Sequence, residues 1–132
     1  MKQDLQYYLG LDWGAMHCGL ALADSELKVA VALEEIATNQ LKERLKWFNR
    51  EYDKPTIILG VPGKNHLTDN WKKIKKLKNE LEKDGWIVEL HEEFFSTQEA
   101  ISNLKIAQKK RINKWDNMEA ARIILQSWLE KK

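Results

Sequence analysis

Residues 5–14 read LQYYLGLDWG and residues 16–23 read MHCGLALA, and these adjoining runs decide the fold. Each run is rich in aliphatic and aromatic side chains over a length typical of a buried strand. Gly14 breaks the first run, and Asp24 and Ser25 end the second, so the links are short. A third strand-like run, residues 27–33 (LKVAVAL), follows at once. We therefore predict three strands joined as an antiparallel meander.

The pattern then alternates between helices and strands. Thr38 is a candidate N-cap for a helix that carries apolar residues from Leu41 to Phe48 at helical spacing. Hairpin-linked strands followed by this alternation predict an α/β fold with a mixed five-stranded sheet, three antiparallel strands and then parallel strands, flanked by helices. We expect residues 1–132 to form one domain. The remaining predicted elements are strands at 56–61 (TIILGV) and 86–90 (WIVEL) and helices over 71–81, from Ser96 onward, and over about 116–129.

Composition excludes several classes of protein. With 132 residues, 43% of them hydrophobic, the chain can bury a core without disulfides and is not intrinsically disordered. The single cysteine, Cys18, excludes an internal disulfide and a multi-cysteine zinc site. A net charge of +2 is too small to indicate nucleic-acid binding by itself. With no signal peptide or transmembrane segment in this sequence, we expect a cytoplasmic protein that does not bind membranes.

Acidic residues stand where predicted strands and the last helix end or begin. Asp12 ends an apolar strand, Glu92 and Glu93 follow another, and Asp116 and Glu119 lie near the start of the last helix. A carboxylate at the end of a buried strand is costly unless it is solvated, hydrogen-bonded or bound to a cation. If these ends converge, oxygen-only ligands suit Mg²⁺ or Mn²⁺, and two such ions can promote phosphodiester hydrolysis.

Each of these acids also has a purely structural interpretation. Asp12 can cap the turn at Gly14, and an acidic pair after a strand is usually solvated. Asp116 and Glu119 have the spacing of a helix capping box, an interpretation at least as good as ligation. Spacing alone does not separate these alternatives, so the metal hypothesis depends on the joint pattern.

The histidines and the cysteine are weaker candidates. His17 and Cys18 are adjacent in a strand, so their side chains point to opposite faces and cannot share a metal. We expect a buried, neutral histidine and a packed thiol there. His91 precedes Glu92 and can assist proton transfer, although an exposed histidine is usually only solvated.

Basic residues cluster despite the small net charge. One cluster lies on the helix over residues 71–81, opposite its apolar face, and is typical of a solvated surface. A second cluster, in the connector at 108–115, directly precedes Asp116 and can hold a phosphate backbone beside a metal site. The residues that we expect to contact nucleic acid are Lys64, Lys110, Arg111 and Lys114.

Four segments, in order, resemble the YqgF/RuvX family over about residues 8–130. Residues 9–14 (LGLDWG), continuing to 19–25 (GLALADS), are similar to its opening motif, and residues 58–62 (ILGVP) to its apolar strand. Residues 92–100 (EEFFSTQEA) are similar to its Asp-Glu-Arg-Leu-Thr-Thr-x-Glu-Ala segment. The helix from Asp116 through Ala120 and Ala121 to Gln126 is similar to its last one. Members are RNase H-like proteins described as Holliday junction resolvases or pre-16S rRNA nucleases.

The resemblance implies a nuclease that depends on divalent metal, with Asp12, Glu93 and Asp116 as its catalytic and metal-binding acids. It also implies an RNase H-like fold and a role in ribosomal RNA maturation. Phe94 stands where the family has an arginine. If the Ala-Ala-x-x-Ile-Leu-Gln sequence sets the register, Asn117 takes the place of the last acid.

Two functions follow as expectations. The first is a Mg²⁺- or Mn²⁺-dependent endonuclease that acts on structured nucleic acid, in 5′-end maturation of pre-16S rRNA. Glu92, Glu119, Asn117 and His91 are its auxiliary or substitute residues. The second is a weak or inactive module of the same fold that binds RNA, a ribosome precursor or branched DNA. The expected partner is pre-rRNA or branched DNA, and the expected state is a monomer or a homodimer.

Overall fold

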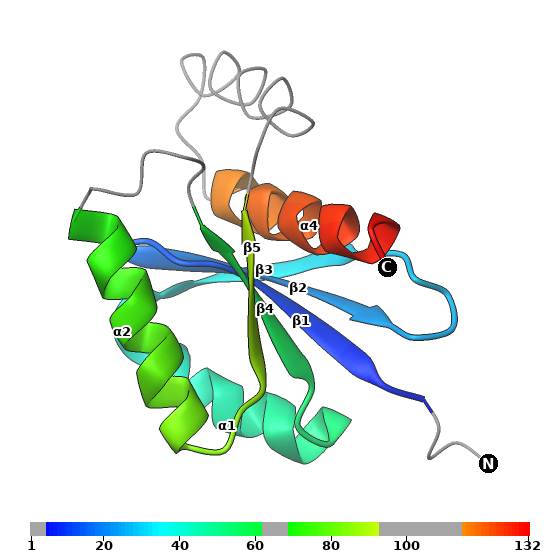
Figure 1. Cartoon of the computed structure of the whole chain (residues 1–132), viewed down its shortest axis with the longest axis horizontal. Helices are drawn as coiled ribbons and strands as arrows, with labels where there is room; N and C mark the ends of the chain where they lie inside the picture. Colours follow the sequence, from blue (N-terminus) through cyan, green and yellow to red (C-terminus); the bar gives the residue numbers. More distant parts are fainter. Residues whose placement is uncertain (1–4, 62–68, 93–114) are drawn as a thin grey trace.

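The computed structural model describes residues 5–61, 69–92 and 115–132. Its five strands form one sheet in the order β3-β2-β1-β4-β5 (Figure 1). β2 pairs antiparallel with β1 and β3, whereas β4 pairs parallel with β1 and β5, which confirms the predicted mixed sheet. The strands are β1 Tyr7–Asp12, β2 His17–Asp24, β3 Val31–Ala37, β4 Thr56–Val61 and β5 Val88–Glu92, and the helices are α1 Leu41–Tyr52, α2 Asp69–Lys83 and α4 Trp115–Glu130.

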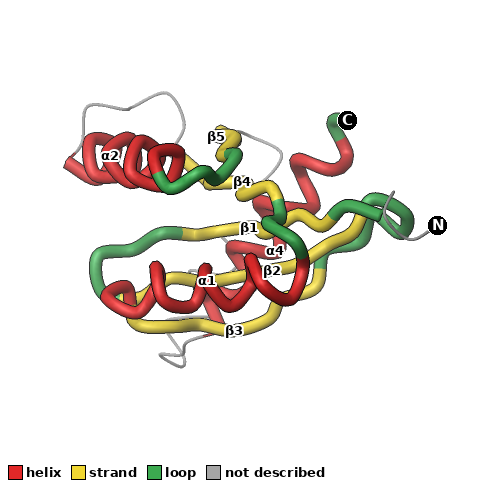
Figure 2. The backbone as a smooth tube through the Cα atoms, turned by 90° about the horizontal axis from the view of Figure 1, so that it is seen from below, coloured by secondary structure: helices red, strands yellow, loops and turns green. Residues whose placement is uncertain are grey.

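Helices cover both faces of the sheet (Figures 1 and 2). In β1, Leu9 and Leu11 join the core under α1 and α2, and Gly10 between them faces α4. The same alternation places Cys18 and Leu20 of β2 in this core under α1 and α2. Strands that are buried on both faces explain why β1, β2 and β4 read as nearly continuous apolar runs.

The third strand begins four residues later than the sequence pattern suggests. It runs over Val31–Ala37 rather than 27–33. Asp24 Oδ1 accepts hydrogen bonds from the backbone N–H groups of Glu26 and Leu27, at 2.9 and 2.7 Å, and Lys28 has a φ of 57°. An acidic side chain that binds the next backbone groups makes a turn, and it holds residues 25–28 out of the sheet.

Thr38 is not the N-cap of α1, so that prediction was wrong. A short 3-10 turn, Thr38–Gln40, precedes the helix, which begins at Leu41. The Thr38 hydroxyl instead donates a 2.6 Å hydrogen bond to the carbonyl of Gly14, and Thr38 N donates to Met16 O at 2.9 Å. These bonds fasten the β1–β2 turn to the start of α1.

The last helix and the last two strands can be compared with their predicted ranges. The last helix is confirmed and spans Trp115–Glu130. The fourth strand is where it was predicted, and the fifth lies two residues later, at Val88–Glu92. The helix predicted from Ser96 lies outside the described residues. Within the described ranges, no helix is both long enough and apolar enough to cross a membrane.

Candidate functional site

Asp12 lies at the carboxyl end of β1, where three parallel strands end together. The register pairs Leu11 with Leu59 and pairs Gly60 with His91, so Asp12, Gly60 and His91 lie level across β1, β4 and β5. Asp12 follows Gly10 by two positions and therefore projects to the α4 face of the sheet. It is partly exposed, as a ligand-binding carboxylate must be.

The start of α4 lies directly over the strand next to Asp12. Gly19 of β2 is the register partner of Asp12. A Cβ atom at Gly19 would lie 1.8 Å from the backbone carbonyl oxygen of Asn117, so the helix rests on the bare backbone there. One and two turns later, Ala121 and Leu125 lie against Gly10 in the same way. Glycines in both strands thus let the amino end of α4 approach the Asp12 end of the sheet.

The other two predicted acids are only partly placed. Asp116 lies in the first turn of α4, next to Asn117, but its side chain is outside the described set. Glu93 follows β5 directly and is also outside the described residues. Asn117, half-buried, lies on the helix face that packs on the sheet. The residues expected to contact nucleic acid, Lys64, Lys110, Arg111 and Lys114, also lie outside the described ranges.

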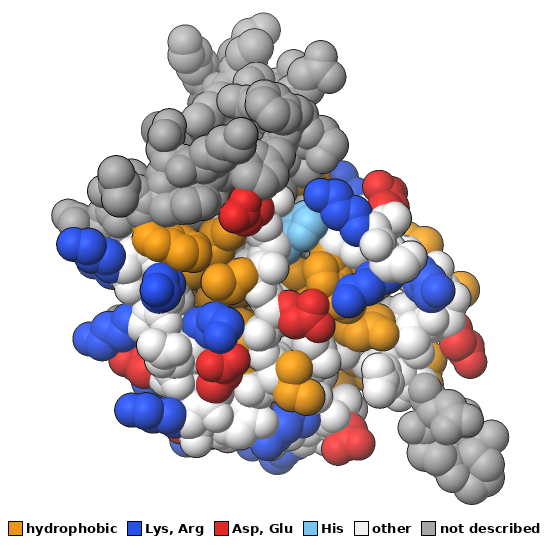
Figure 3. Space-filling model, viewed as in Figure 1, with side chains coloured by type: hydrophobic (Ala, Val, Ile, Leu, Met, Phe, Trp, Pro, Cys, Tyr) orange, Lys and Arg blue, Asp and Glu red, His pale blue; other side chains and the backbone are white. Residues whose placement is uncertain are grey.

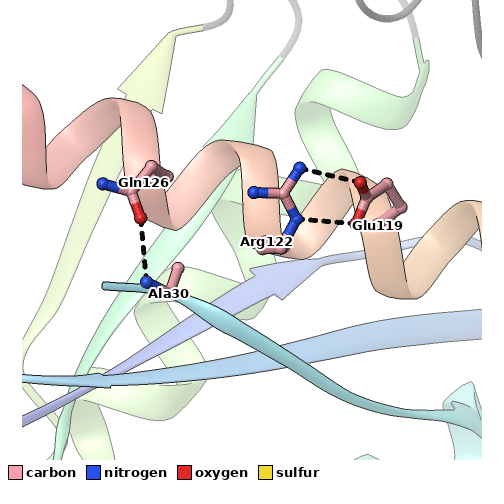
Figure 4. A network of polar contacts seen from close by, with 4 residues as sticks. All are labelled: Ala30, Glu119, Arg122 and Gln126. Atoms are coloured by element: carbon pink, nitrogen blue, oxygen red, sulfur yellow. Dashed lines mark hydrogen bonds and ion pairs between the residues drawn. The ribbon is translucent and has the colours of Figure 1, made fainter.

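Glu119 is held by a neighbour on its own helix. Its two carboxylate oxygens accept hydrogen bonds from Nε and Nη2 of Arg122, both at 2.7 Å (Figure 4). These bonds lower the pKa of Glu119 and raise the pKa of Arg122. Further along the same helix, Gln126 accepts a 2.8 Å hydrogen bond from the backbone N–H of Ala30, which ties α4 to the β2–β3 loop (Figure 4).

His91 is buried, with 7% of its surface exposed, so it is not a solvated histidine. Its Nε2 lies 3.0 Å from the hydroxyl of Ser127 on α4. Burial lowers the pKa of His91, and nearby Lys131 lowers it further. The neutral imidazole therefore links β5 to α4, as does the 3.1 Å hydrogen bond that Trp128 donates to Glu89.

The His17–Cys18 pair separates as the strand geometry requires. Cys18 is fully buried, and its sulfur lies 3.4 Å from the Thr38 hydroxyl. Burial raises the pKa of this thiol, so it is a packed thiol, as expected, and not a thiolate. His17 is exposed, which corrects the expectation of a buried histidine.

Glu35 is a carboxylate that the sequence pattern did not single out. It lies in β3 opposite Gly19, on the far side of that glycine from Asp12. Its Oε1 atom is buried and has no hydrogen-bond partner among the described residues. Two strand spacings, about 10 Å, separate the backbones of Asp12 and Glu35, with Gly19 between them.

The part of the chain that the structure describes contains no group of three or more His, Cys, Asp or Glu side chains arranged to hold a metal ion. Two of the three predicted ligands, Glu93 and the Asp116 side chain, fall outside that part. Within it, Asp12 supplies a hard oxygen ligand of the kind that Mg²⁺ and Mn²⁺ prefer. The exposed Glu92, at the end of β5, is level with Val61 at the same edge of the sheet.

The fold is similar to that of known resolvases. A fowlpox virus resolvase, solved with Holliday junction DNA, superposes with a TM-score of 0.60 over 96% of this chain and 98% of that one, at 13% identity. T. thermophilus RuvC, solved with a Holliday junction substrate, gives a TM-score of 0.54 over 96% of this chain and 94% of that one, at 11% identity. At such identities the likeness establishes an RNase H-like fold alone.

Sequence comparison establishes the family. A protein of Dictyoglomus turgidum named "Putative pre-16S rRNA nuclease" is 33% identical, with 92% of each chain covered. A protein of the same name from an Anaeromyxobacter species is 32% identical, over 93% of this chain and 96% of the relative. The family model described as "RuvX: Holliday junction resolvase" matches residues 6–131. The chain therefore belongs to the RuvX family of RNase H-like proteins.

Proposed function

We propose that this protein is a divalent-metal-dependent endonuclease that cleaves a phosphodiester in pre-16S rRNA during 5′-end maturation in the cytoplasm. The observation that carries the proposal is the position of Asp12 in a chain of this family. The carboxylate ends β1, lies level with the ends of two parallel strands, and faces the amino end of α4. Relatives that match nearly the whole chain carry the name "Putative pre-16S rRNA nuclease".

In this proposal Asp12, Glu93 and Asp116 hold one or two Mg²⁺ or Mn²⁺ ions. Carboxylate oxygens match the preference of these ions, and the aligned strand ends supply a shared edge at which ligands collect. When bound, such ions activate water and stabilise the leaving oxygen of a phosphodiester. Lys64, Lys110, Arg111 and Lys114 position the phosphate backbone.

The packing contacts of α4 bear on which of its acids, Asp116 or Glu119, belongs to the proposed site. The close approach at Gly19 fixes how far the first turn of α4 lies from the sheet. The packing at Gly10 fixes the rotation of α4 about its own axis. The bidentate bond to Arg122 keeps Glu119 on the helix surface. These contacts favour Asp116 over Glu119 as the acid from α4.

The position of Asn117 at the start of α4 favours a second function. Asn117 lies on the sheet-facing side of α4, against the strand beside Asp12. An amide there is neutral and holds a cation less strongly than a carboxylate. If this residue takes the place of the third acid, the protein is an RNA-binding module with little or no cleavage.

Cleavage of a labelled pre-16S rRNA transcript with and without metal tests the proposal. We expect the purified protein to cut the transcript in Mn²⁺ or Mg²⁺ and to lose all activity in a chelator. Activity should return when the metal is restored, because the ions bind to a folded site and are not part of the core. Salt-dependent RNA binding without cleavage at any Mn²⁺ concentration would contradict the nuclease and support the binding module.

A further inference from the structure

A cavity of about 480 Å³ opens beside the Asp12 end of the sheet, on the face opposite α4. Trp13, the residue that follows Asp12, forms one wall, and the chain entering α1 and one side of α2 form the others. Figure 2 shows the loop after β1 and the start of α1 at one end of the molecule, with α2 alongside. We call this cavity the Trp13 pocket; it is lined by Trp13, Thr38, Asn39, Leu41, Lys42, Lys73, Lys76, Leu77 and Glu80.

A hydrogen bond of Thr38 and one ion pair hold the elements around the Trp13 pocket together. Thr38 holds the β1–β2 turn through its 2.6 Å bond to Gly14. Lys42 of α1 pairs with Glu80 of α2 at 3.0 Å across the pocket. Leu41 and Leu77, exposed by only 2% and 8%, belong to the core beneath. A pocket between anchored elements can hold a ligand without first being ordered.

The charge of the Trp13 pocket favours an anion. Three lysines line it against one glutamate, and that glutamate is neutralised by Lys42. Lys73 and Lys76 are exposed, and neither lies within salt-bridge distance of a carboxylate among the described residues, although Lys76 helps to lower the pKa of nearby Glu80. Lysine and arginine side chains are frequent over the α2 side of the molecule (Figure 3). Two ammonium groups beside an aromatic wall are the combination that single-stranded nucleic-acid sites use, because phosphates pair with the lysines and a base stacks on the ring.

The position of Trp13 relative to Asp12 connects this pocket to the proposed reaction. The two residues are consecutive, so their Cα atoms are about 3.8 Å apart. Their side chains leave the strand on opposite faces, Asp12 toward α4 and Trp13 toward the core under α1 and α2. A polynucleotide that crosses this edge of the sheet can therefore place a phosphate at Asp12 and a neighbouring nucleotide in the pocket.

We propose that the Trp13 pocket holds an unpaired nucleotide of the substrate strand, next to the phosphate that lies at Asp12. The proposal rests on the nuclease function proposed above. It assigns the base to Trp13 and the flanking phosphates to Lys73 and Lys76. It also makes the enzyme selective for a single-stranded or unpaired stretch beside the cleavage position, since a paired base cannot enter the pocket.

Binding of a fluorescein-labelled oligouridine, measured by anisotropy in chelator over a range of salt concentrations, tests this assignment. Chelator prevents cleavage, so failure of the nuclease proposal would appear in the cleavage assay and not here. Trp13→Ala is expected to weaken binding about tenfold with an unchanged salt slope, because stacking releases no counterions. Trp13→Phe keeps an aromatic face and should recover most of the loss. The double variant Lys73→Ala, Lys76→Ala should reduce the salt slope by roughly 1.4, or about 0.7 for each phosphate contact.

The double variant Lys72→Ala, Lys75→Ala is the matched control, because both lysines are exposed and, unlike Lys78 with its ion pair to Glu82, neither is in a salt bridge among the described residues. It removes the same charge from the same helix, and neither residue lines the pocket. A blunt RNA duplex should bind equally well to wild type and Trp13→Ala, because a paired base cannot enter the pocket. Unchanged oligouridine binding by both pocket variants would overturn the proposal, as would equal losses in the pocket and control pairs. Circular dichroism of each variant confirms that the fold is retained.

Discussion

Asp12→Asn is expected to lower the rate of metal-dependent cleavage on the order of 100- to 1000-fold. The substitution keeps the size and shape of the side chain and removes the negative charge that would bind the cation. Asp12 is partly exposed at the end of β1, so we expect little change in the free energy of unfolding. The rate of transcript cleavage in Mn²⁺ and a urea unfolding curve give the two measurements.

Asp24→Asn is the matched control for this variant. Asp24 is paired with Tyr7 at the opposite end of the same two strands, and the amide oxygen can still accept the bonds from Glu26 and Leu27. Cleavage by Asp24→Asn should equal that of the wild type. If Asp12→Asn cuts at the wild-type rate in Mn²⁺, Asp12 is not a ligand and the proposed site is wrong.

Gly19→Ala is expected to destabilise the fold by about 2–3 kcal/mol. The new Cβ would lie 1.8 Å from the carbonyl oxygen of Asn117 and 2.7 Å from the amide nitrogen of Met118. These are backbone atoms, so the contact is relieved only by moving the first turn of α4 away from the sheet. Urea unfolding followed by circular dichroism measures the loss.

Gly60→Ala provides a graded comparison. A Cβ at Gly60 would meet Ile124, with the nearest atom, Cδ1, at 2.3 Å. The end of a side chain can rotate away, whereas a backbone carbonyl cannot, so the cost at Gly60 should be smaller. Equal stability of Gly19→Ala and the wild type would show that α4 does not rest on β2 as described. In the nuclease, the displaced helix should also reduce cleavage more in Gly19→Ala than in Gly60→Ala.

Much of the fold was predictable because its strands carry unambiguous patterns. The continuous apolar runs of β1, β2 and β4 reflect burial on both faces. In α4, the apolar residues recur at helical spacing and form the face that packs on the sheet. The start of β3 was not predictable from alternation. The bonds of Asp24 to the following backbone hold apolar Leu27 in a turn.

The site was predictable only in part, because its residues are brought together by packing. Asp12 stands out as a charge at the end of an apolar strand, and the register places it at the edge where β1, β4 and β5 end. Lys73 and Lys76 look like a solvated helix face in the sequence. Their proximity to Trp13 depends on where α2 lies beside the sheet, which no local pattern specifies. Glu35 has no sequence signal either, since its buried oxygen results from the placement of neighbouring elements.

Paramagnetic broadening by Mn²⁺ tests most directly whether the acidic edge of the sheet binds a divalent cation. In an ¹⁵N–¹H spectrum of the full chain, substoichiometric Mn²⁺ should first broaden the amides near Asp12, Gly19 and His91. The amides of Tyr7 and Thr56, at the other end of these strands, should stay sharp, and Asp12→Asn should abolish the selective effect. Uniform broadening, or broadening centred away from Asp12, would contradict a metal site at this edge.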